Sequence, residues 1–311
     1  MKQRVLVADK IHSDAINMME DAGLDLVVNF EISREELKAQ IPEFDAIIVR
    51  SRTKVTREII EAGKGLVLIA RSGVGLDNID LEAAEERGIR VVNSPEASSV
   101  SVAELTLGAM ISLMRNIHTA DRSMKEGKWL KKELEGRELR GKTLGIIGLG
   151  RIGQEVARRA VVFQMRILSY DILEEISPEA ERLGVEFVGT SREALEKLLR
   201  ESDVITLHVP YQPETAHMIG AKEISLMKDG AYILNVARGG ILDEKALYEA
   251  LKSEKIAGAA LDCYEQEPPN NLPLADLPNV LCTPHIGSAT QEALIANSTI
   301  IAEKVIDFFK R

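Results

Sequence analysis

Three polar side chains follow apolar runs late in the sequence and have the types needed to move a proton beside a carboxylate. Arg238 comes after the run 232–235, Glu267 after 257–261 and His285 after 280–283. Open α/β sheets bind ligands outside the carboxyl ends of their strands, so we expect these side chains to meet there. Histidine titrates closest to neutral pH, which suits a proton donor and acceptor. An arginine guanidinium can hold a carboxylate through two parallel hydrogen bonds.

A carboxylate on the other ring nitrogen of His285 would orient the imidazole and stabilise its charged form. Glu265 and Glu267 both lie in the right segment, and Glu267 is preferred, although spacing alone does not decide between them. Taken singly, a packed histidine, a solvated loop acid and a surface arginine are the ordinary interpretations. The combination at strand ends favours acid–base chemistry. His208 also ends a strand, but we assign it no catalytic role.

A glycine-rich loop earlier in the chain indicates a dinucleotide site. The apolar strand 143–147 leads into Gly148, Gly150 and Gly153 with the G-x-G-x-x-G spacing, and a helical pattern follows. The first glycine permits a tight turn, the second lets the backbone approach a pyrophosphate, and the third allows close helix–strand packing. The strand and the helix around the motif make it specific.

The residue that ends the next strand favours NAD over NADP. Asp171 follows the strand 166–170, eighteen residues after Gly153. A carboxylate there accepts hydrogen bonds from the adenosine ribose, whereas a 2′-phosphate would place two negative charges side by side. No basic residue immediately follows Asp171 to offset that repulsion.

The positions of these residues require two doubly wound α/β domains. Apolar runs alternate with amphipathic stretches, which predicts parallel sheets built from βαβ units. The first sheet is expected from strands at 5–8, 26–28, 46–49, 66–70 and 90–93, and the second from strands at 143–147, 166–170, 204–208, 232–235, 257–261 and 280–283. A buried helix is expected over 98–117, followed by a polar stretch over 121–141, and a last helix over 291–309 that returns to the first domain. Ser33 and Glu36 have the spacing of a capping box.

The composition is that of an ordinary globular protein and excludes several functions. The 311 residues exceed the usual size of one core, and the net charge of −10 argues against a nucleic-acid partner. The apolar run at the N-terminus is too short for a signal peptide, so a cytoplasmic location is expected. The two cysteines, Cys263 and Cys282, have no metal-ligand spacing and are taken as core residues; no metal is expected.

The motifs together resemble the D-isomer-specific 2-hydroxy-acid dehydrogenases over nearly the whole chain. The resemblance rests on the glycine loop with Arg238, Glu267 and His285 in that order, and on the segments 49–51, 70–80, 102–105, 141–153, 208–210 and 284–287. Within the family, the sequence is most similar to the branch that oxidises 3-phosphoglycerate at C2 with NAD in serine biosynthesis. The longer members carry a C-terminal regulatory domain that binds serine, which is not expected in a chain ending at Arg311.

The resemblance implies a role for each matching residue. Arg238 would hold the substrate carboxylate, His285 would be the acid and base, and Glu267, rather than Glu265, would be its partner. The implied cofactor contacts are Val74, Gly148, Gly150, Arg151, Ile152, Gly153, Asp171, His208, Val209, Pro210, Val236, Ala237, Arg238, Asp262, His285, Gly287 and Ser288. The implied substrate contacts are Arg50, Ser51, Arg52, Arg71, Ser72, Gly73, Val74, Lys131, Arg238 and His285.

The family fold implies a flavodoxin-like substrate domain, residues 1–94 plus 287–311, into which a Rossmann NAD-binding domain, 95–286, is inserted. Catalysis would take place between the domains, and a homodimer, or a tetramer, would form through the NAD domain. The segment Ser72–Gly75 would present backbone N–H groups to the substrate carboxylate. Ser98 departs from the pattern, since that branch commonly has a substrate-contacting asparagine there.

Two other functions remain open from the sequence. A glyoxylate/hydroxypyruvate or D-lactate-type reductase of the same family would share every residue that takes part in the reaction. A binding protein that senses a dinucleotide and recruits partners would keep the fold, but it would not require the complete acid–base pair.

Overall fold

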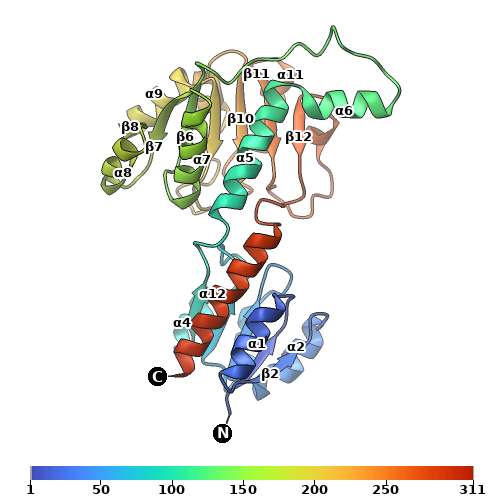
Figure 1. Cartoon of the computed structure of the whole chain (residues 1–311), viewed down its shortest axis with the longest axis vertical. Helices are drawn as coiled ribbons and strands as arrows, with labels where there is room; N and C mark the ends of the chain where they lie inside the picture. The colour runs from blue at the N-terminus through green and yellow to red at the C-terminus, as the bar shows by residue number, and fades with distance from the viewer. Residues whose placement is uncertain (1, 311) are drawn as a thin grey trace. The chain divides into compact units, whose positions relative to one another are not determined.

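The computed structural model describes residues 2–310 and divides the chain into two compact units (Figure 1). Unit 1 comprises Met1–Ser99 and Ser288–Arg311, and unit 2 comprises Val100–Gly287. From the sequence, the two borders are expected after residues 94 and 286, whereas the structure has them after residues 99 and 287.

Unit 1 is a parallel sheet in the order β2-β1-β3-β4-β5, the flavodoxin-like arrangement. Its strands are β1 (Arg4–Val7), β2 (Asp25–Val28), β3 (Ala46–Val49), β4 (Leu68–Arg71) and β5 (Arg90–Asn93). Its helices are α1 (Ser13–Asp21), α2 (Arg34–Gln40), α3 (Arg57–Ala62), α4 (Leu81–Glu86) and α12 (Gln291–Phe309), with a 3₁₀ turn, η1 (Ile41–Glu43). The expected capping box of Ser33 and Glu36 opens α2.

Both faces of this sheet are buried, as the continuous apolar strands predict. Val5 and Val7 pack with α1 and α12 through Ala15, Ile301 and Val305. Leu6, between them, faces the opposite core, which also contains residues of α2, α3 and α4. The last helix therefore packs on the first sheet.

Unit 2 is a parallel sheet in the order β12-β11-β10-β9-β6-β7-β8, the Rossmann order extended by one strand at the β12 edge. Its strands are β6 (Thr143–Ile147), β7 (Arg166–Tyr170), β8 (Glu186–Gly189), β9 (Val204–Leu207), β10 (Ala231–Asn235), β11 (Ile256–Leu261) and β12 (Val280–Cys282). Its helices are α6 (Ile117–Lys125), α7 (Arg151–Val162), α8 (Ser177–Arg182), α9 (Arg192–Glu201), α10 (Ala221–Leu226) and α11 (Glu244–Lys252), with 3₁₀ turns η2 (Glu174–Ile176) and η3 (Pro273–Asp276). The helix α5 (Ser99–Met114) begins at the unit border and packs with α7 on one face of the sheet.

Two elements differ from the sequence prediction. The helix expected over 98–117 ends at Met114, because Asn116 adopts a left-handed conformation with φ of 53° and a second helix, α6, begins there. That helix runs to Lys125, into the stretch over 121–141 that was described only as polar. The strand β8 was not predicted, since Glu186–Gly189 is short and lies at the sheet edge, where alternation of apolar residues is weak.

No single helix among residues 2–310 is long and apolar enough to cross a membrane; α5 and α6 meet the length and composition criteria only as a pair bent by 68°.

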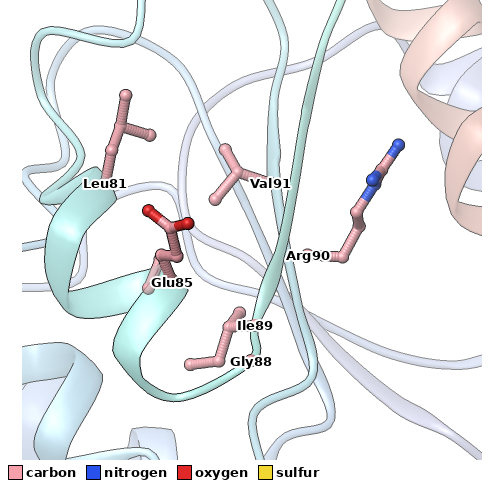
Figure 2. A pocket seen from close by; sticks show the side chains of 7 residues that line it. Leu81, Glu85, Gly88, Ile89, Arg90 and Val91 are labelled. Atoms are coloured by element: carbon pink, nitrogen blue, oxygen red, sulfur yellow. The ribbon is translucent and has the colours of Figure 1, made fainter.

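A pocket of about 380 Å³ lies in unit 1 between α4 and the start of β5 (Figure 2). Leu81, Glu85, Ile89 and Arg90 are among the residues that line it. None of the predicted site residues borders it.

Candidate active site

The carboxyl ends of three adjacent parallel strands bring the predicted acid–base residues to one edge of unit 2. The strand β10 pairs with β11, and β11 pairs with β12, so Asn235 aligns with Leu261 and Leu261 with Cys282. Arg238, Glu267 and His285 lie in the loops that follow these three strands. Strand order, rather than closeness in sequence, assembles the site.

Glu267 and His285 form a direct contact. The Nδ1 atom of His285 lies 2.7 Å from Oε2 of Glu267, and both side chains are partly exposed, at 44% and 38%. The backbone N–H of Tyr264 donates to the other carboxylate oxygen at 3.1 Å. The carboxylate is therefore held in place, and it leaves the Nε2 atom of His285 as the ring nitrogen available for proton transfer.

Asp262 fixes the turn that carries His285. Its buried carboxylate accepts hydrogen bonds from the backbone N–H groups of Ile286 and Gly287, both at 2.8 Å, and from the hydroxyl of Thr283 at 2.6 Å. His285 itself has a φ of 53°, which costs a residue with a side chain about 1–2 kcal/mol. The bonds to Asp262 hold this strained conformation. The cofactor contact expected of Asp262 together with the His285–Ser288 turn stays a prediction; in the structure Asp262 holds that turn.

Glu265, the other carboxylate considered, points elsewhere. It accepts a hydrogen bond from the backbone N–H of Glu244 at 3.2 Å, at the start of α11, and lies 3.2 Å from Nε2 of His217. Burial raises the pKa of Glu244, whose carboxylate accepts the backbone N–H of Glu265. Glu265 and Glu267, two residues apart in the same loop, thus have separate partners.

Arg238 is positioned by its own loop. Its Nη1 donates to the carbonyl of Ala237 at 2.7 Å, while the side chain of Asn235 donates to the carbonyl of Arg238 at 2.8 Å and accepts from the N–H of Ala237 at 3.2 Å. Gly239 has to be glycine, because a Cβ there would overlap the carbonyl of Tyr264. The loops after β10 and β11 are therefore packed directly against each other.

Cys263 borders this site, which sequence reasoning missed. The residue is buried, as expected of a core cysteine, but its Sγ lies within 4.8 Å of a carboxylate oxygen of Glu267 and a ring nitrogen of His285. Its thiol donates to the carbonyl of Ala237 at 3.4 Å. Its place directly after Asp262 at a strand end was the available signal. Cys282 is half-buried, and burial raises the pKa of its thiol.

The glycine loop has the geometry of a dinucleotide cradle. Gly148 has a φ of 93°, and a Cβ there would lie 2.6 Å from the carbonyl oxygen of His208. A Cβ on Gly153 would overlap the carbonyl of Gly148, so this glycine brings α7 against the loop. Gly150, the N-cap of α7, has open space around its Cβ position. An anion can approach the backbone at that point, beside the positive end of a helix dipole.

The other predicted cofactor residues surround this loop or the strand ends beside it. Asp171 follows β7, accepts the N–H of Leu149 at 2.8 Å and the N–H of Leu173 at 3.1 Å, and is thereby fixed at the loop. Arg151 is exposed and Ile152 half-buried at the start of α7. His208, Val209 and Pro210 follow β9, and Val236 and Ala237 follow β10. Ser288 belongs to unit 1.

His208 is held in its neutral form. The residue as a whole is half-buried, but its Nδ1 is enclosed without a hydrogen-bond partner among residues 2–310, and its Nε2 lies 3.0 Å from the hydroxyl of Thr206. Burial lowers the pKa of His208 to about 3. The ring is therefore neutral at neutral pH and is not a proton donor.

This neutral histidine predicts a pH-dependent loss of stability. The unfolded chain binds the proton near pH 6.5 and the folded chain only near pH 3, so the free energy of unfolding falls as the pH drops between those values. Between pH 7 and pH 5 we expect wild type to lose about 1–2 kcal/mol more than a His208→Gln variant. Urea unfolding of both proteins at the two pH values measures the difference. Equal losses would contradict a buried neutral ring.

In unit 1, the basic residues after β3 are not equivalent. Arg52 donates to Asp9 at 2.9 Å and to the carbonyls of Ile32 and Ala8 at 3.1 and 2.6 Å, which commits three of its five donors. Asp9 is buried and also accepts the N–H of Arg50 at 2.5 Å. Arg50 is half-buried and makes one longer contact, 3.3 Å, from Nη1 to the carbonyl of Lys10. The side chain of Arg52 therefore holds the loop after β3 in place, whereas the side chain of Arg50 contributes one long contact to it.

The expected backbone anion nest at 72–75 is narrower than predicted. The N–H of Ser72 donates to Val49 at 2.8 Å, and the N–H of Gly73 donates to the hydroxyl of Ser94 at 2.9 Å. Two of the four N–H groups thus stabilise the fold rather than face a ligand. Arg71, at the end of β4, is oriented by Asn78, because its Nε–H donates a hydrogen bond to Oδ1 of Asn78 at 3.2 Å. The exposed Lys131 lies in the segment after α6.

Ser98 also has an internal partner. It is buried, and its hydroxyl accepts a hydrogen bond from the side chain of Asn297 in α12 at 3.0 Å. Asn297 in turn accepts the hydroxyl of Ser94 at 2.5 Å. Ser94 and Ser98 thus tie α12 to the loop after β5.

Comparison with known proteins identifies the family. Residues 107–287 match the NAD binding domain of the D-isomer specific 2-hydroxyacid dehydrogenases. A hydroxypyruvate reductase from Thermotoga maritima is 48% identical over 307 residues, which cover 98% of this chain and 97% of that protein. The chain belongs to the D-isomer specific 2-hydroxyacid dehydrogenase family. The family resemblance and the NAD-binding domain read from the sequence are therefore confirmed.

Other family members share both sequence and fold. A D-3-phosphoglycerate dehydrogenase from Methanocaldococcus jannaschii is 52% identical over 304 residues, 97% of this chain. The chain spans 56% of that protein's length, and it spans a similar share of several other D-3-phosphoglycerate dehydrogenases. A D-lactate dehydrogenase from Aquifex aeolicus, solved with NAD and lactic acid, aligns with a TM-score of 0.83 at 33% identity, covering 99% of this chain and 96% of that one. These matches confirm the predicted fold class.

Proposed function

We propose that this chain oxidises 3-phospho-D-glycerate at C2 to 3-phosphohydroxypyruvate, reversibly and with NAD. The observation that carries the proposal is the 2.7 Å contact between Glu267 and His285 at the strand ends of a NAD-binding domain. The D-3-phosphoglycerate dehydrogenases that share up to 52% of its residues support the choice of substrate.

The residues of unit 2 fit NAD. The open space at Gly150, the start of α7 and the fixed carboxylate of Asp171 provide a pyrophosphate site and a ribose partner. When bound, NAD supplies the acceptor for the hydride that leaves C2 of the substrate. The neutral side chain of His208 adds no charge at the end of β9, where its backbone lies against the glycine loop at Gly148.

In the proposed mechanism, His285 moves the proton and Glu267 holds the ring. Because Nδ1 faces Glu267, the neutral imidazole keeps its proton on Nδ1 and presents the lone pair of Nε2 to the substrate hydroxyl. Nε2 takes the hydroxyl proton as the C2–H bond breaks, and the carboxylate of Glu267 offsets the positive charge on the ring. In the reverse direction, Nε2 donates the proton to the carbonyl oxygen.

Basic side chains would hold the two anionic groups of the substrate. Arg238 would bind the C1 carboxylate through two parallel hydrogen bonds, which orient C2 for reaction. For the phosphate we propose Arg50 and Arg71, with Lys131 as a further cation. We assign Arg52 to the loop structure, since three of its donors are already used within unit 1.

A substrate panel tests the proposal. The purified chain should show its highest kcat/KM with 3-phosphoglycerate or 3-phosphohydroxypyruvate, compared with hydroxypyruvate, glyoxylate and pyruvate at matched NAD or NADH. We expect the phosphate contacts to give a preference of about 10²-fold or more, because charge-assisted hydrogen bonds are worth about 1.5–3 kcal/mol each. A preference for an unphosphorylated acid would contradict the proposed substrate.

One alternative has a specific observation in its favour. The Thermotoga maritima hydroxypyruvate reductase matches this chain over nearly the full length of both proteins. A hydroxypyruvate reductase would use the same Arg238, Glu267 and His285 but would not need Arg50 and Arg71. In that case, replacing Arg50 and Arg71 together with glutamine would leave kcat/KM for the best substrate nearly unchanged.

We also propose that the chain forms a homodimer through unit 2. Ile117, Met124 and Trp129 lie on α6 and the segment after it, which extend away from the sheet (Figure 1), and their side chains are 49%, 56% and 76% exposed. Clustered exposed apolar side chains commonly mark protein interfaces. Sedimentation at micromolar concentration should give a mass about twice 34.2 kDa, and Trp129→Glu should weaken the dimer. A monomeric wild type would contradict this proposal.

A further inference from the structure

Three side chains with different donor atoms converge at the edge of the proposed site. The thiol of Cys263, a carboxylate oxygen of Glu267 and a ring nitrogen of His285 all lie within 4.8 Å of one another. They come from the loops after β11 and β12, and Asp262 and Tyr264 fix the loop positions through the bonds described above. The backbones of the loops that carry the cluster are therefore held by the fold.

The spacing of these atoms suits a tetrahedral zinc ion after a small adjustment. Zinc binds cysteine sulfur at about 2.3 Å and histidine nitrogen or carboxylate oxygen at about 2.0–2.2 Å, which separates neighbouring ligand atoms by about 3.3–3.6 Å. In the structure, Nδ1 of His285 and Oε2 of Glu267 lie 2.7 Å apart, and one ligand atom from each of the three residues lies within 4.8 Å of the other two. Rotation of the partly exposed Glu267 and His285 side chains can bring all three within range, while the buried sulfur stays in place.

The donor set and its access favour zinc over other divalent ions. A thiolate is a soft ligand that selects zinc or copper, and imidazole with carboxylate completes a common zinc combination, whereas magnesium and calcium prefer oxygen alone. Glu267 and His285 are exposed, so an ion can enter from solvent and keep water in a fourth position. The buried Cys263 lies on the side of the proposed ion site away from solvent.

We infer that Cys263, Glu267 and His285 form an inhibitory zinc site. Binding releases the thiol proton and, where Nδ1 is the ligand, the ring proton to solvent, and it breaks the Glu267–His285 hydrogen bond. The ion then occupies the two groups that the proposed mechanism uses for proton transfer. The inhibition rests on the proposed function, but binding of the ion does not.

Cobalt absorption tests binding without reference to activity. Co²⁺ titrated into the metal-free chain should produce the near-ultraviolet band of a cobalt–thiolate bond together with the intense visible bands of a tetrahedral site. The band should disappear in Cys263→Ser and in the apolar variant Cys263→Val, which guards against misfolding of the first. It should persist in Cys282→Ser, the matched control at the only other cysteine. Absence of the band in wild type, its persistence without Cys263, or its loss with Cys282→Ser would overturn the site.

Inhibition by Zn²⁺ tests the consequence. With the best substrate of the panel, Zn²⁺ should inhibit wild type and Cys282→Ser alike, and excess chelator should restore turnover. The concentration for half inhibition should rise about 100-fold in Cys263→Ser and Cys263→Val, because one of three protein ligands is lost. Equal sensitivity of all variants would overturn the inhibitory role. A chain that shows the cobalt band but no dehydrogenase activity would contradict the proposed function and leave the ion site standing.

Discussion

Replacing His285 with alanine is expected to lower kcat by about 10²- to 10⁴-fold, the usual contribution of a positioned acid or base. The reason is geometric: Nδ1 is bound to Glu267 at 2.7 Å, so Nε2 is the nitrogen that can exchange a proton with the substrate hydroxyl. Steady-state kinetics with the best substrate of the panel measures the loss. The substitution leaves no cavity in the core, since the side chain of His285 is partly exposed.

The affinity for NADH separates this chemical effect from a disturbed cofactor site. Fluorescence titration should give His285→Ala an NADH dissociation constant within about threefold of wild type, a difference of less than 1 kcal/mol. Glu267→Gln should lower kcat less, by about 10- to 100-fold, because an amide can still orient the ring but carries no charge. A His285→Ala variant with wild-type kcat would refute the assigned role.

Replacing Arg238 with alanine is expected to reduce kcat/KM by about 10³-fold, and with lysine by about 10- to 100-fold. An arginine fork gives two parallel charge-assisted hydrogen bonds to a carboxylate, each worth about 1.5–3 kcal/mol, whereas a lysine supplies the charge without the fork. Asn235, at the end of β10, donates to the backbone carbonyl of Arg238 and fixes it, so the variants should keep their fold. Kinetics over a range of substrate concentrations resolves kcat and KM.

Arg200→Ala provides a matched control for the loss of one positive charge. Arg200 lies in α9 and pairs with Glu196 on the surface, where such a pair contributes little. Its kcat/KM should equal that of wild type. If Arg238→Lys matched wild type as well, the proposed two-bond contact with the carboxylate would be wrong.

Much of the fold was predictable because the central strands of both sheets are buried on both faces. Short runs rich in apolar residues, such as Thr143–Ile147 and Arg166–Tyr170, mark strand positions, and the structure has these strands with the same bounds. The last helix likewise has its predicted bounds, Gln291–Phe309. The break at Asn116 was missed because apolar residues continue from α5 to Ile117, and a single left-handed residue leaves that pattern intact.

The positions of the site residues at the strand ends were predictable from the sequence. The contacts that their side chains make were not. Asn235, Leu261 and Cys282 end neighbouring strands, so the loops after them had to meet. Sequence spacing could not show that Glu265 turns to α11, nor that Cys263 points toward Glu267. These outcomes depend on loop packing, such as that of Gly239 against Tyr264, which no periodicity records.

The transfer of deuterium from substrate to cofactor tests the central claim most directly. The best substrate of the panel, deuterated at C2, is incubated with the chain and NAD, and the reduced cofactor is examined by proton NMR. We expect one deuterium at C4 of the nicotinamide, with none lost to water, because the hydrogen at C2 leaves as hydride while His285 takes the hydroxyl proton. Reduced cofactor without the label, or substrate that loses its deuterium to solvent, would contradict it.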